Sequence, residues 1–212
     1  MKESTRKILD ELTLKYPQLQ SCKNDIERAF IMLKSCFEKG GSIFVCGNGG
    51  SSSDCEHIVG ELLKSFKKHR PICQTINEKL MAFGEDGEYL SRKLEGALPA
   101  YSLISQTGII TAFANDKAWD VTYAQELYGL GKAGDCLISL STSGNSKNCI
   151  YATIVAKTKN INTLSLTGMG GGKLKDYSNV TISVPETETY KVQELHLPIY
   201  HCLCAMLEEE FF

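Results

Sequence analysis

Short apolar runs alternate with longer amphipathic segments along most of the chain. Apolar and β-branched residues bounded by turn signals predict buried strands, and these lie at 42–47, 100–104, 135–140, 162–166 and 180–184. Helical periodicity predicts helices between them, at about 51–66, 108–113, 121–130, 147–159 and 188–210. This alternation predicts an α/β fold, with a doubly wound, mostly parallel sheet flanked by helices.

Two segments stand outside this alternation. Residues 1–40 carry the periodicity of two helices, which is broken at Tyr16-Pro17. The apolar faces of these N-terminal helices would suit either the chain's own sheet or an interface between subunits. Residues 67–96 are interpreted as an insertion or lid with two short helical pieces, whose basic start either holds a phosphate or is solvated. We therefore expect one domain over residues 1–212.

A glycine-rich loop follows the first predicted strand. Gly47-Asn48-Gly49-Gly50 allows positive φ and close approach of the backbone to a ligand. Ser51 to Asp54 then supply candidate N-cap oxygens for the next helix. A strand, a glycine turn and a helix N-terminus together form an anion site, because free N–H groups and the helix dipole converge there.

On the same predicted helix, His57 and Glu61 are four residues apart and therefore share one face. Such a pair is most often a surface ion pair. Placed one turn beyond an anion-binding loop, it also fits a metal site or an acid/base couple.

A second polar loop follows the predicted strand at 135–140. Ser141-Thr142-Ser143-Gly144-Asn145-Ser146 places several hydroxyl groups between a buried strand and a helix start. Serine clusters usually mark turns, but hydroxyl groups in this position can donate to phosphate oxygens. Both loops are expected at the carboxyl ends of strands, where such sheets bind ligands.

The last predicted helix carries Gln193 and His201, two turns apart on roughly one face. His201 lies among apolar residues, so it is either a core histidine or a ligand. Pro198 removes one backbone N–H between them and is expected to kink the helix.

Composition narrows the class of protein. The chain has 212 residues, 42% of them hydrophobic and 23% charged, with a net charge of −2 and no basic run, so nucleic acid is not an expected partner. No membrane span or secretion signal is expected, and this predicts a cytoplasmic protein. The nine cysteines are scattered and contain no C-x-x-C pair, which favours buried reduced thiols.

Taken in order, the motifs resemble those of SIS-domain proteins, and more closely the phosphoheptose (sedoheptulose 7-phosphate) isomerases. The resemblance covers about residues 23–210. It rests on four stretches of the sequence: GNGGSSSDCEHIVGELL at 47–63, FAND at 113–116, STSGNSKN at 141–148 and TYKVQELHLPIYH at 189–201.

The resemblance implies a zinc-dependent isomerase that converts sedoheptulose 7-phosphate into D-glycero-D-manno-heptose 7-phosphate, in a homotetramer with sites between subunits. It implies zinc ligation by His57, Glu61, Gln193 and His201, and proton transfer by Glu61 and His201. It implies that the sugar phosphate is bound by Asn48, Gly49, Gly50, Ser51, Glu61, Asn115, Asp116, Ser141, Thr142, Ser143, Ser146 and Gln193.

The sequence also departs from the family pattern. Lys64-Ser65-Phe66 stands where the family has Gly-Arg before an aromatic residue, Lys191 replaces an arginine, Pro198 is additional, and the 67–96 segment is longer. Two alternatives remain open: a SIS domain that binds a phosphosugar or a protein partner without chemistry, and an isomerase for a different phosphosugar.

Overall fold

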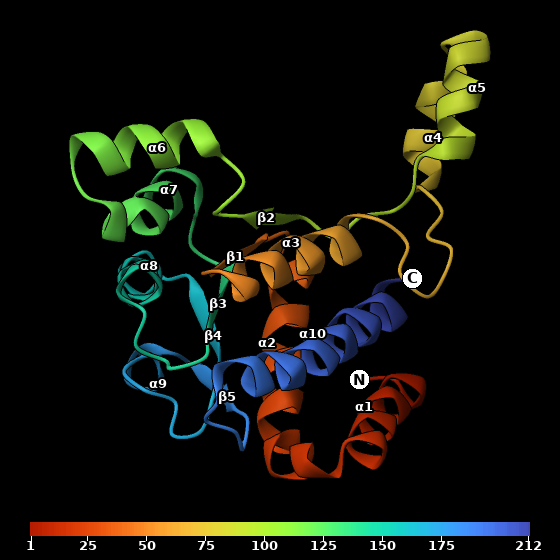
Figure 1. The fold of residues 1–212 in the computed structure, drawn as a ribbon. Coiled ribbons are helices and arrows are strands. Elements are labelled where there is room, and N and C mark those ends of the chain that lie inside the picture. Colours follow the sequence, from red (N-terminus) through yellow and green to blue (C-terminus); the bar gives the residue numbers. More distant parts are fainter.

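A parallel five-stranded sheet forms the centre of the computed structural model, which describes residues 1–212 (Figure 1). The strands occur in the order β2-β1-β3-β4-β5. Their bounds are Ile43–Gly47 for β1, Ala100–Ser102 for β2, Cys136–Ser141 for β3, Asn162–Thr167 for β4 and Val180–Ser183 for β5. All neighbouring strands are parallel, which confirms the predicted doubly wound α/β fold.

Helices precede, connect and follow the strands. The first part of the chain has α1 (Glu3–Lys15), the 3-10 helix η1 (Pro17–Cys22), α2 (Lys23–Glu38), α3 (Gly50–Leu63), α4 (Gln74–Met81) and α5 (Gly84–Lys93). The second part has α6 (Thr107–Asp116), the 3-10 helix η2 (Trp119–Val121), α7 (Thr122–Leu130), α8 (Lys147–Thr158), α9 (Leu174–Tyr177) and α10 (Thr189–Phe211).

Each face of the sheet has its own apolar core. Alternate β1 residues face opposite sides: Ile43 and Val45 join the larger core with α1, α2, α3 and α10, whereas Phe44 and Cys46 join the smaller core with α7 and α8. A strand covered on both faces must be apolar throughout, which explains why the first predicted strand has no polar alternation.

The N-terminal helices pack on their own chain. On α2, Ile26, Phe30 and Leu33 are buried in the larger core, and α1 lies along α10. Of the two alternatives for these apolar faces, the structure therefore shows packing on the chain's own core.

Two local expectations were wrong. Ser51 to Asp54 lie inside α3 and do not cap it, because Gly49 is the N-cap residue and no side chain makes a capping bond. Asn115 and Asp116 belong to the last turn of α6, which extends past the predicted helix end at residue 113. Helix α10 continues through Pro198, and the kink expected there stays a prediction.

Residues 74–93 form a helical hairpin of α4 and α5, which projects from the body of the molecule (Figure 1). No residue of α4 and only Gly87 of α5 is buried. The basic segment before the hairpin was expected to bind phosphate or to be solvated, and for Arg70 both expectations are wrong: its side chain is fully buried and paired with Glu208.

All nine cysteines are free thiols, and all except Cys73 are buried, as the scattered pattern predicts. Among the helices, none combines the length and the apolar character that crossing a bilayer requires.

The C-terminal end of α10 is tied to the N-terminus through Glu210. This carboxylate accepts hydrogen bonds from the Lys2 backbone N–H (2.6 Å), the Thr5 hydroxyl (2.7 Å) and Lys34 Nζ (2.8 Å). Burial alone would raise the pKa of Glu210, but these donors outweigh it and lower the pKa to about 2.

A carboxylate whose pKa is depressed by folding stabilises the protein above its unfolded pKa, and this contribution disappears as the pH falls through the folded value. We therefore expect the stability advantage of the wild type over Glu210→Gln to shrink between about pH 4.5 and pH 2. Urea unfolding across this range measures the advantage, and an advantage that stays constant down to pH 2 would contradict the prediction.

Candidate active site

The two predicted anion-binding loops lie side by side at the carboxyl ends of the neighbouring strands β1 and β3. Strands β1 and β3 are parallel neighbours with Gly47 paired to Leu140, so the loops that follow them leave the sheet together. The strand order reverses between β1 and β3, because β2 lies on one side of β1 and β3 on the other. Open α/β sheets bind their ligands at such a switch point.

The first loop turns through Gly49, whose φ of +56° is in the left-handed region. Gly50 follows as the first residue of α3, and the Gln193 amide of α10 lies against it. A Cβ atom at Gly50 would lie 2.7 Å from Gln193 Nε2. Gln193 Nε2 also donates a long hydrogen bond (3.5 Å) to the Ser51 hydroxyl. Gln193 therefore lies at the N-terminus of α3, beside the first loop.

Asn48 joins the first loop to the helix after the second. Its side-chain amide donates to Asn148 Oδ1 (3.0 Å) and accepts from Asn148 Nδ2 (2.7 Å). The Tyr123 hydroxyl donates to the Gly47 carbonyl (2.8 Å) from the other side. Sequence reasoning missed Tyr123 and left Asn148 without a role, although Asn148 ends the STSGNSKN motif. The Asn48 side chain therefore links the first loop to the start of α8, which follows the second loop.

The second loop presents hydroxyl groups at the end of β3. Ser141 Oγ lies 2.9 Å from Ser146 Oγ, and Ser146 immediately precedes α8. The Ser143 hydroxyl accepts a hydrogen bond from the Asn145 N–H (3.1 Å) and remains exposed. With the start of α8 beside them, these hydroxyls form the kind of surface that binds a phosphate dianion.

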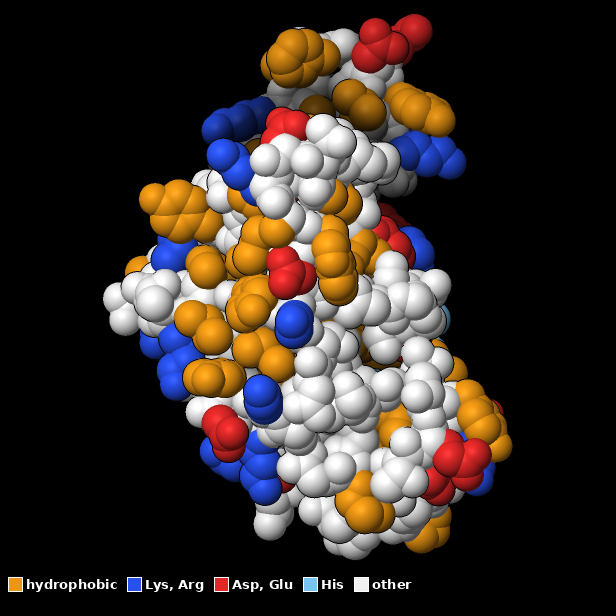
Figure 2. Space-filling model, turned by 60° about the vertical axis from the view of Figure 1, so that its left-hand side comes forward, with side chains coloured by type: hydrophobic (Ala, Val, Ile, Leu, Met, Phe, Trp, Pro, Cys, Tyr) orange, Lys and Arg blue, Asp and Glu red, His pale blue; other side chains and the backbone are white.

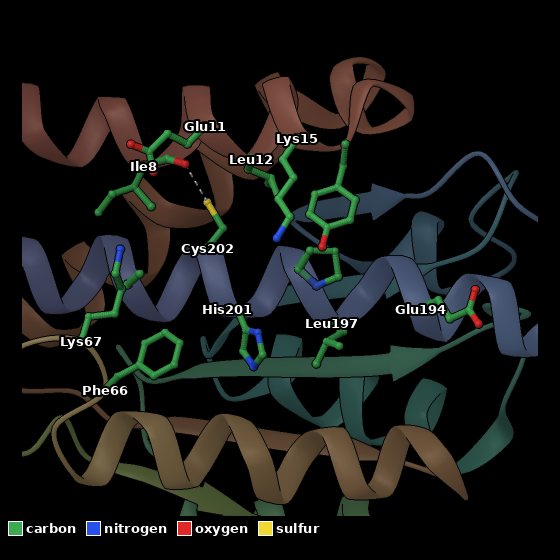
Figure 3. A pocket seen from close by; sticks show the side chains of 13 residues that line it. Ile8, Glu11, Leu12, Lys15, Phe66, Lys67, Glu194, Leu197, His201 and Cys202 are labelled. Carbon is green, nitrogen blue, oxygen red and sulfur yellow. Dashed lines mark hydrogen bonds between the residues drawn. The ribbon is translucent and has the colours of Figure 1, made fainter.

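Two turns along α3, three titratable side chains converge. His57 Nε2 lies 3.1 Å from Glu61 Oε1 and 3.4 Å from His201 Nε2 of α10. The i, i+4 spacing on α3 brings the first two together, and the packing of α10 on α3 brings the third. Figure 3 shows His201 pointing from α10 toward α3, beside Phe66.

A hydrogen-bond chain behind His57 sets which of its nitrogens carries a proton. The Tyr200 hydroxyl donates to Asp54 Oδ1 (3.0 Å), so it accepts from His57 Nδ1 (3.1 Å). Burial, and then the Asp54 charge, raise the pKa of Tyr200, which keeps its proton in place. With the proton on Nδ1, a neutral His57 presents the lone pair of Nε2 to Glu61 and His201.

In this arrangement the lone pairs of His57 Nε2 and Glu61 Oε1 face each other. An ionised Glu61 and an unprotonated His57 Nε2 repel at 3.1 Å unless a cation, either a proton or a metal ion, lies between them. Glu61 Oε2 is buried without a hydrogen-bond partner, and Lys64 Nζ is 3.6 Å away. Burial, and then the neighbouring His57, lower the pKa of His201, which favours its neutral form.

The donor types and spacings fit a zinc ion. At zinc–nitrogen and zinc–oxygen bonds of about 2.0–2.1 Å, ligand atoms of a tetrahedral site lie roughly 3.3 Å apart, close to the 3.1 and 3.4 Å observed. As the side chains stand, no three His, Cys, Asp or Glu residues form a complete metal-binding group. The zinc site therefore stays a prediction that rests on convergent donors.

The structure does not join every predicted site residue to this cluster. Gln193 makes its one hydrogen bond to Ser51 and none to His57, Glu61 or His201. Asn115 and Asp116, at the exposed end of α6, make a side-chain hydrogen bond only to each other (2.9 Å). Within one chain, these two residues do not contact the His57–Glu61–His201 cluster.

A groove of about 290 Å³ opens beside His201 on the outer side of α10 (Figure 3). Its walls come from α1, α10 and the segment after α3. It is lined by Ile8, Glu11, Leu12, Lys15, Tyr16, Phe66, Lys67, Glu194, Leu197, Pro198, His201, Cys202 and Ala205. Of the His57–Glu61–His201 cluster, only His201 lines this groove.

Comparison with known proteins agrees with this geometry. A family model described as "SIS domain" matches residues 10–97. The chain is 32% identical to the phosphoheptose isomerase of Akkermansia muciniphila, over 93% of this chain and 91% of that protein. It is 36% identical to that of Helicobacter pylori strain P12, over 91% and 88%. The solved structure of a phosphoheptose isomerase from Francisella tularensis superposes with a TM-score of 0.76 at 28% identity, covering 98% of this chain and 94% of that one.

Proposed function

This chain belongs to the phosphoheptose isomerase family of SIS-domain proteins, and from that we propose that it interconverts sedoheptulose 7-phosphate and D-glycero-D-manno-heptose 7-phosphate. Membership itself makes the chain an isomerase and supports a sugar phosphate as substrate. The single observation that carries the chemistry is the convergence of Glu61, His57 and His201 beside the two loops.

The reaction moves a carbonyl from C2 to C1, which requires one proton transfer between carbons and one between oxygens. In our proposal the Glu61 carboxylate takes a proton from C1, an enediol forms, and Glu61 returns the proton to C2. The neutral His201 accepts the O1 proton and delivers it to O2, so that the carbonyl forms at C1 as Glu61 protonates C2. A neutral His201 and a carboxylate on the facing helix supply the two groups that this requires.

The phosphate end of the substrate would be held by the paired loops. The hydroxyls of Ser141, Thr142, Ser143 and Ser146, together with the N-terminus of α8, supply donors for its oxygens. The Gly49–Ser51 turn would approach the sugar from the neighbouring strand end. Asn115 and Asp116 would contribute from another subunit, because they do not reach the cluster within their own.

In our proposal His57, Glu61 and His201 hold a zinc ion, with Gln193 as the expected fourth ligand. Because an atom bound to the ion cannot also accept a proton, Glu61 and His201 would release the ion in part during turnover. When bound, zinc would act as a Lewis acid that stabilises negative charge on the substrate oxygens. Tyr200 and Asp54 would orient His57 for this role, since a hydrogen bond to the second ring nitrogen fixes a ligating histidine.

We also propose a cytoplasmic homo-oligomer, which the family resemblance implies to be a tetramer. Helix α6 is apolar, yet none of its residues is buried. Figure 2 shows hydrophobic side chains gathered on the face that α6 and α7 present. Both carboxylate oxygens of Glu126 on α7 are buried without a partner, and burial raises its pKa to about 7. A second copy covering this face would bury the apolar surface and bring Asn115 and Asp116 near another site.

The test is an isomerase assay on protein stripped of metal with a chelator and then reconstituted with zinc. We expect sedoheptulose 7-phosphate to turn over only in the reconstituted protein, with about one zinc bound per chain. His201→Ala is expected to lower kcat by roughly 10²-fold or more, since it removes a proton-transfer group.

The outcomes separate the parts of the proposal. Full activity in metal-free protein would contradict the zinc role and leave the acid/base roles. Turnover of a shorter phosphoketose but not of the heptulose phosphate would contradict the substrate, and would direct attention to the longer 67–96 segment.

A further inference from the structure

Arg70 is a buried charged residue that the proposed chemistry does not use. Its side chain has no solvent exposure and makes three directed hydrogen bonds. Nε donates to Glu208 Oε1 (2.7 Å), Nη1 to the Leu62 carbonyl (2.8 Å) and Nη2 to the Glu61 carbonyl (2.8 Å). A guanidinium buried with directed bonds to two helices fixes their relative position, because its planar donors allow little freedom.

The carboxylate of Glu208, the partner of Arg70, also accepts several hydrogen bonds. Glu208 of α10 accepts hydrogen bonds from the backbone N–H groups of Phe66 (2.8 Å), Lys67 (2.8 Å) and Lys68 (3.1 Å), as well as from Arg70. The chain after α3 therefore wraps around one carboxylate. With both ions paired and hydrogen-bonded, neither remains as an uncompensated buried charge.

These bonds also complete the C-terminus of α3. The last carbonyls of a helix lack partners within it and carry the negative end of the helix dipole. Lys64, which follows the last helical residue, is extended, with φ −135° and ψ 171°. No glycine caps this end of the helix. The Arg70 guanidinium donates hydrogen bonds to the Glu61 and Leu62 carbonyls instead.

The turn that Arg70 caps is the turn that carries the Glu61 carboxylate, and Glu208 lies seven residues beyond His201 on α10. We propose that Arg70 is a positioning residue, which through Glu208 holds Glu61 at the distance from His201 that proton transfer requires. This inference rests on the proposed role of Glu61. A displacement of about 1 Å at a reacting group can cost roughly 10²-fold in rate.

The C-terminal residue and the base of the α4–α5 hairpin enclose the Arg70 side chain. The Phe212 ring covers the guanidinium, with 5.1 Å between Cζ and the ring centroid. The Gly96 N–H, at the base of the α4–α5 hairpin, donates to the Arg70 carbonyl (2.7 Å). A Cβ atom at Gly96 would lie 2.5 Å from the Phe212 ring. The side chain is packed on all sides, so a shorter cation cannot reproduce its three bonds.

The test compares Arg70→Lys with the wild type and with Lys34→Met. Lysine keeps the charge against Glu208 but cannot also reach both carbonyls. We expect kcat to fall roughly 10- to 100-fold with KM within about threefold, and amide hydrogen exchange at residues 61–63 to accelerate. Lys34→Met is the matched control, because it removes the Lys34–Glu210 pair from the same end of α10 without touching α3. It should leave kcat and the exchange of residues 61–63 unchanged.

A second variant keeps the inference testable if lysine distorts the fold. Arg70→Ala should regain part of its kcat when guanidinium ion is added at low millimolar concentration. Unchanged exchange at 61–63 in Arg70→Lys, or faster exchange with a wild-type kcat, would overturn the inference. An inactive wild type would instead contradict the proposed function, and the exchange measurement would still decide whether Arg70 holds the Glu61 turn.

Discussion

Replacing Glu61 with glutamine is expected to lower kcat by about 10²–10⁴-fold while the protein stays folded. Glutamine has nearly the same shape, so the packing of α3 against α10 should survive. The amide cannot accept the proton from C1, and it is a poorer partner for a cation beside His57 Nε2. Steady-state kinetics on the zinc-loaded protein measures the loss, and circular dichroism checks the fold.

Glu56→Gln is the matched control, since it removes one carboxylate from the same helix at an exposed position. Its side chain bonds to Ser105 and lies outside the cluster. We expect wild-type kinetics from this variant. Glu61→Gln with more than a tenth of the wild-type kcat would contradict the assignment of Glu61 as the proton carrier.

Gly144→Ala is expected to destabilise the protein by about 2–5 kcal/mol and to weaken phosphate binding. Gly144 adopts φ +65°, and a Cβ atom there would lie 2.0 Å from the Gly171 carbonyl oxygen and 2.9 Å from Gly172 Cα. Both obstacles are backbone atoms, so no side-chain rotation relieves the clash. The Ser141–Ser146 loop would therefore separate from the Gly168–Gly172 segment. Urea unfolding gives the free energy, and KM for the phosphosugar reports on the loop.

Gly170→Ala separates the clash from the backbone strain. Gly170 also has positive φ (+90°), but a Cβ atom there would meet nothing within 4 Å. This variant should show the cost of positive φ without the collision. Equal destabilisation by the two substitutions would contradict the close approach described for Gly144.

The parts of the fold and site that the sequence predicted correctly are those set by neighbouring residues. Apolar runs at β1 and β3, each followed by a glycine- or serine-rich turn, placed both loops at strand ends. The four-residue spacing of His57 and Glu61 predicted a shared helical face, and their 3.1 Å contact confirms that they meet. Periodicity and turn chemistry act over a few residues, which is why they can be read in advance.

The features that sequence reasoning missed depend on partners far along the chain. Arg70 follows two lysines and a histidine, so the segment has the composition of a solvated loop, and its burial depends on Glu208, which lies 138 residues away. Tyr200 follows the apolar pair Pro198-Ile199 and has the pattern of a core position, but Asp54 and His57 give it a polar role. The end of α6 was misplaced because Asn and Asp favour turns, whereas the helix here continues through both residues.

Only one thiol of the native chain is accessible to a labelling reagent. Eight cysteines are buried, and burial raises the pKa of Cys202 and Cys204 to about 12, so they remain unreactive thiols at neutral pH. Cys73 alone is exposed, directly before α4 and three residues after Arg70. A maleimide dye added to unmodified protein would therefore attach at the base of the projecting hairpin. Its fluorescence would report on the surroundings of the hairpin base without any engineered cysteine.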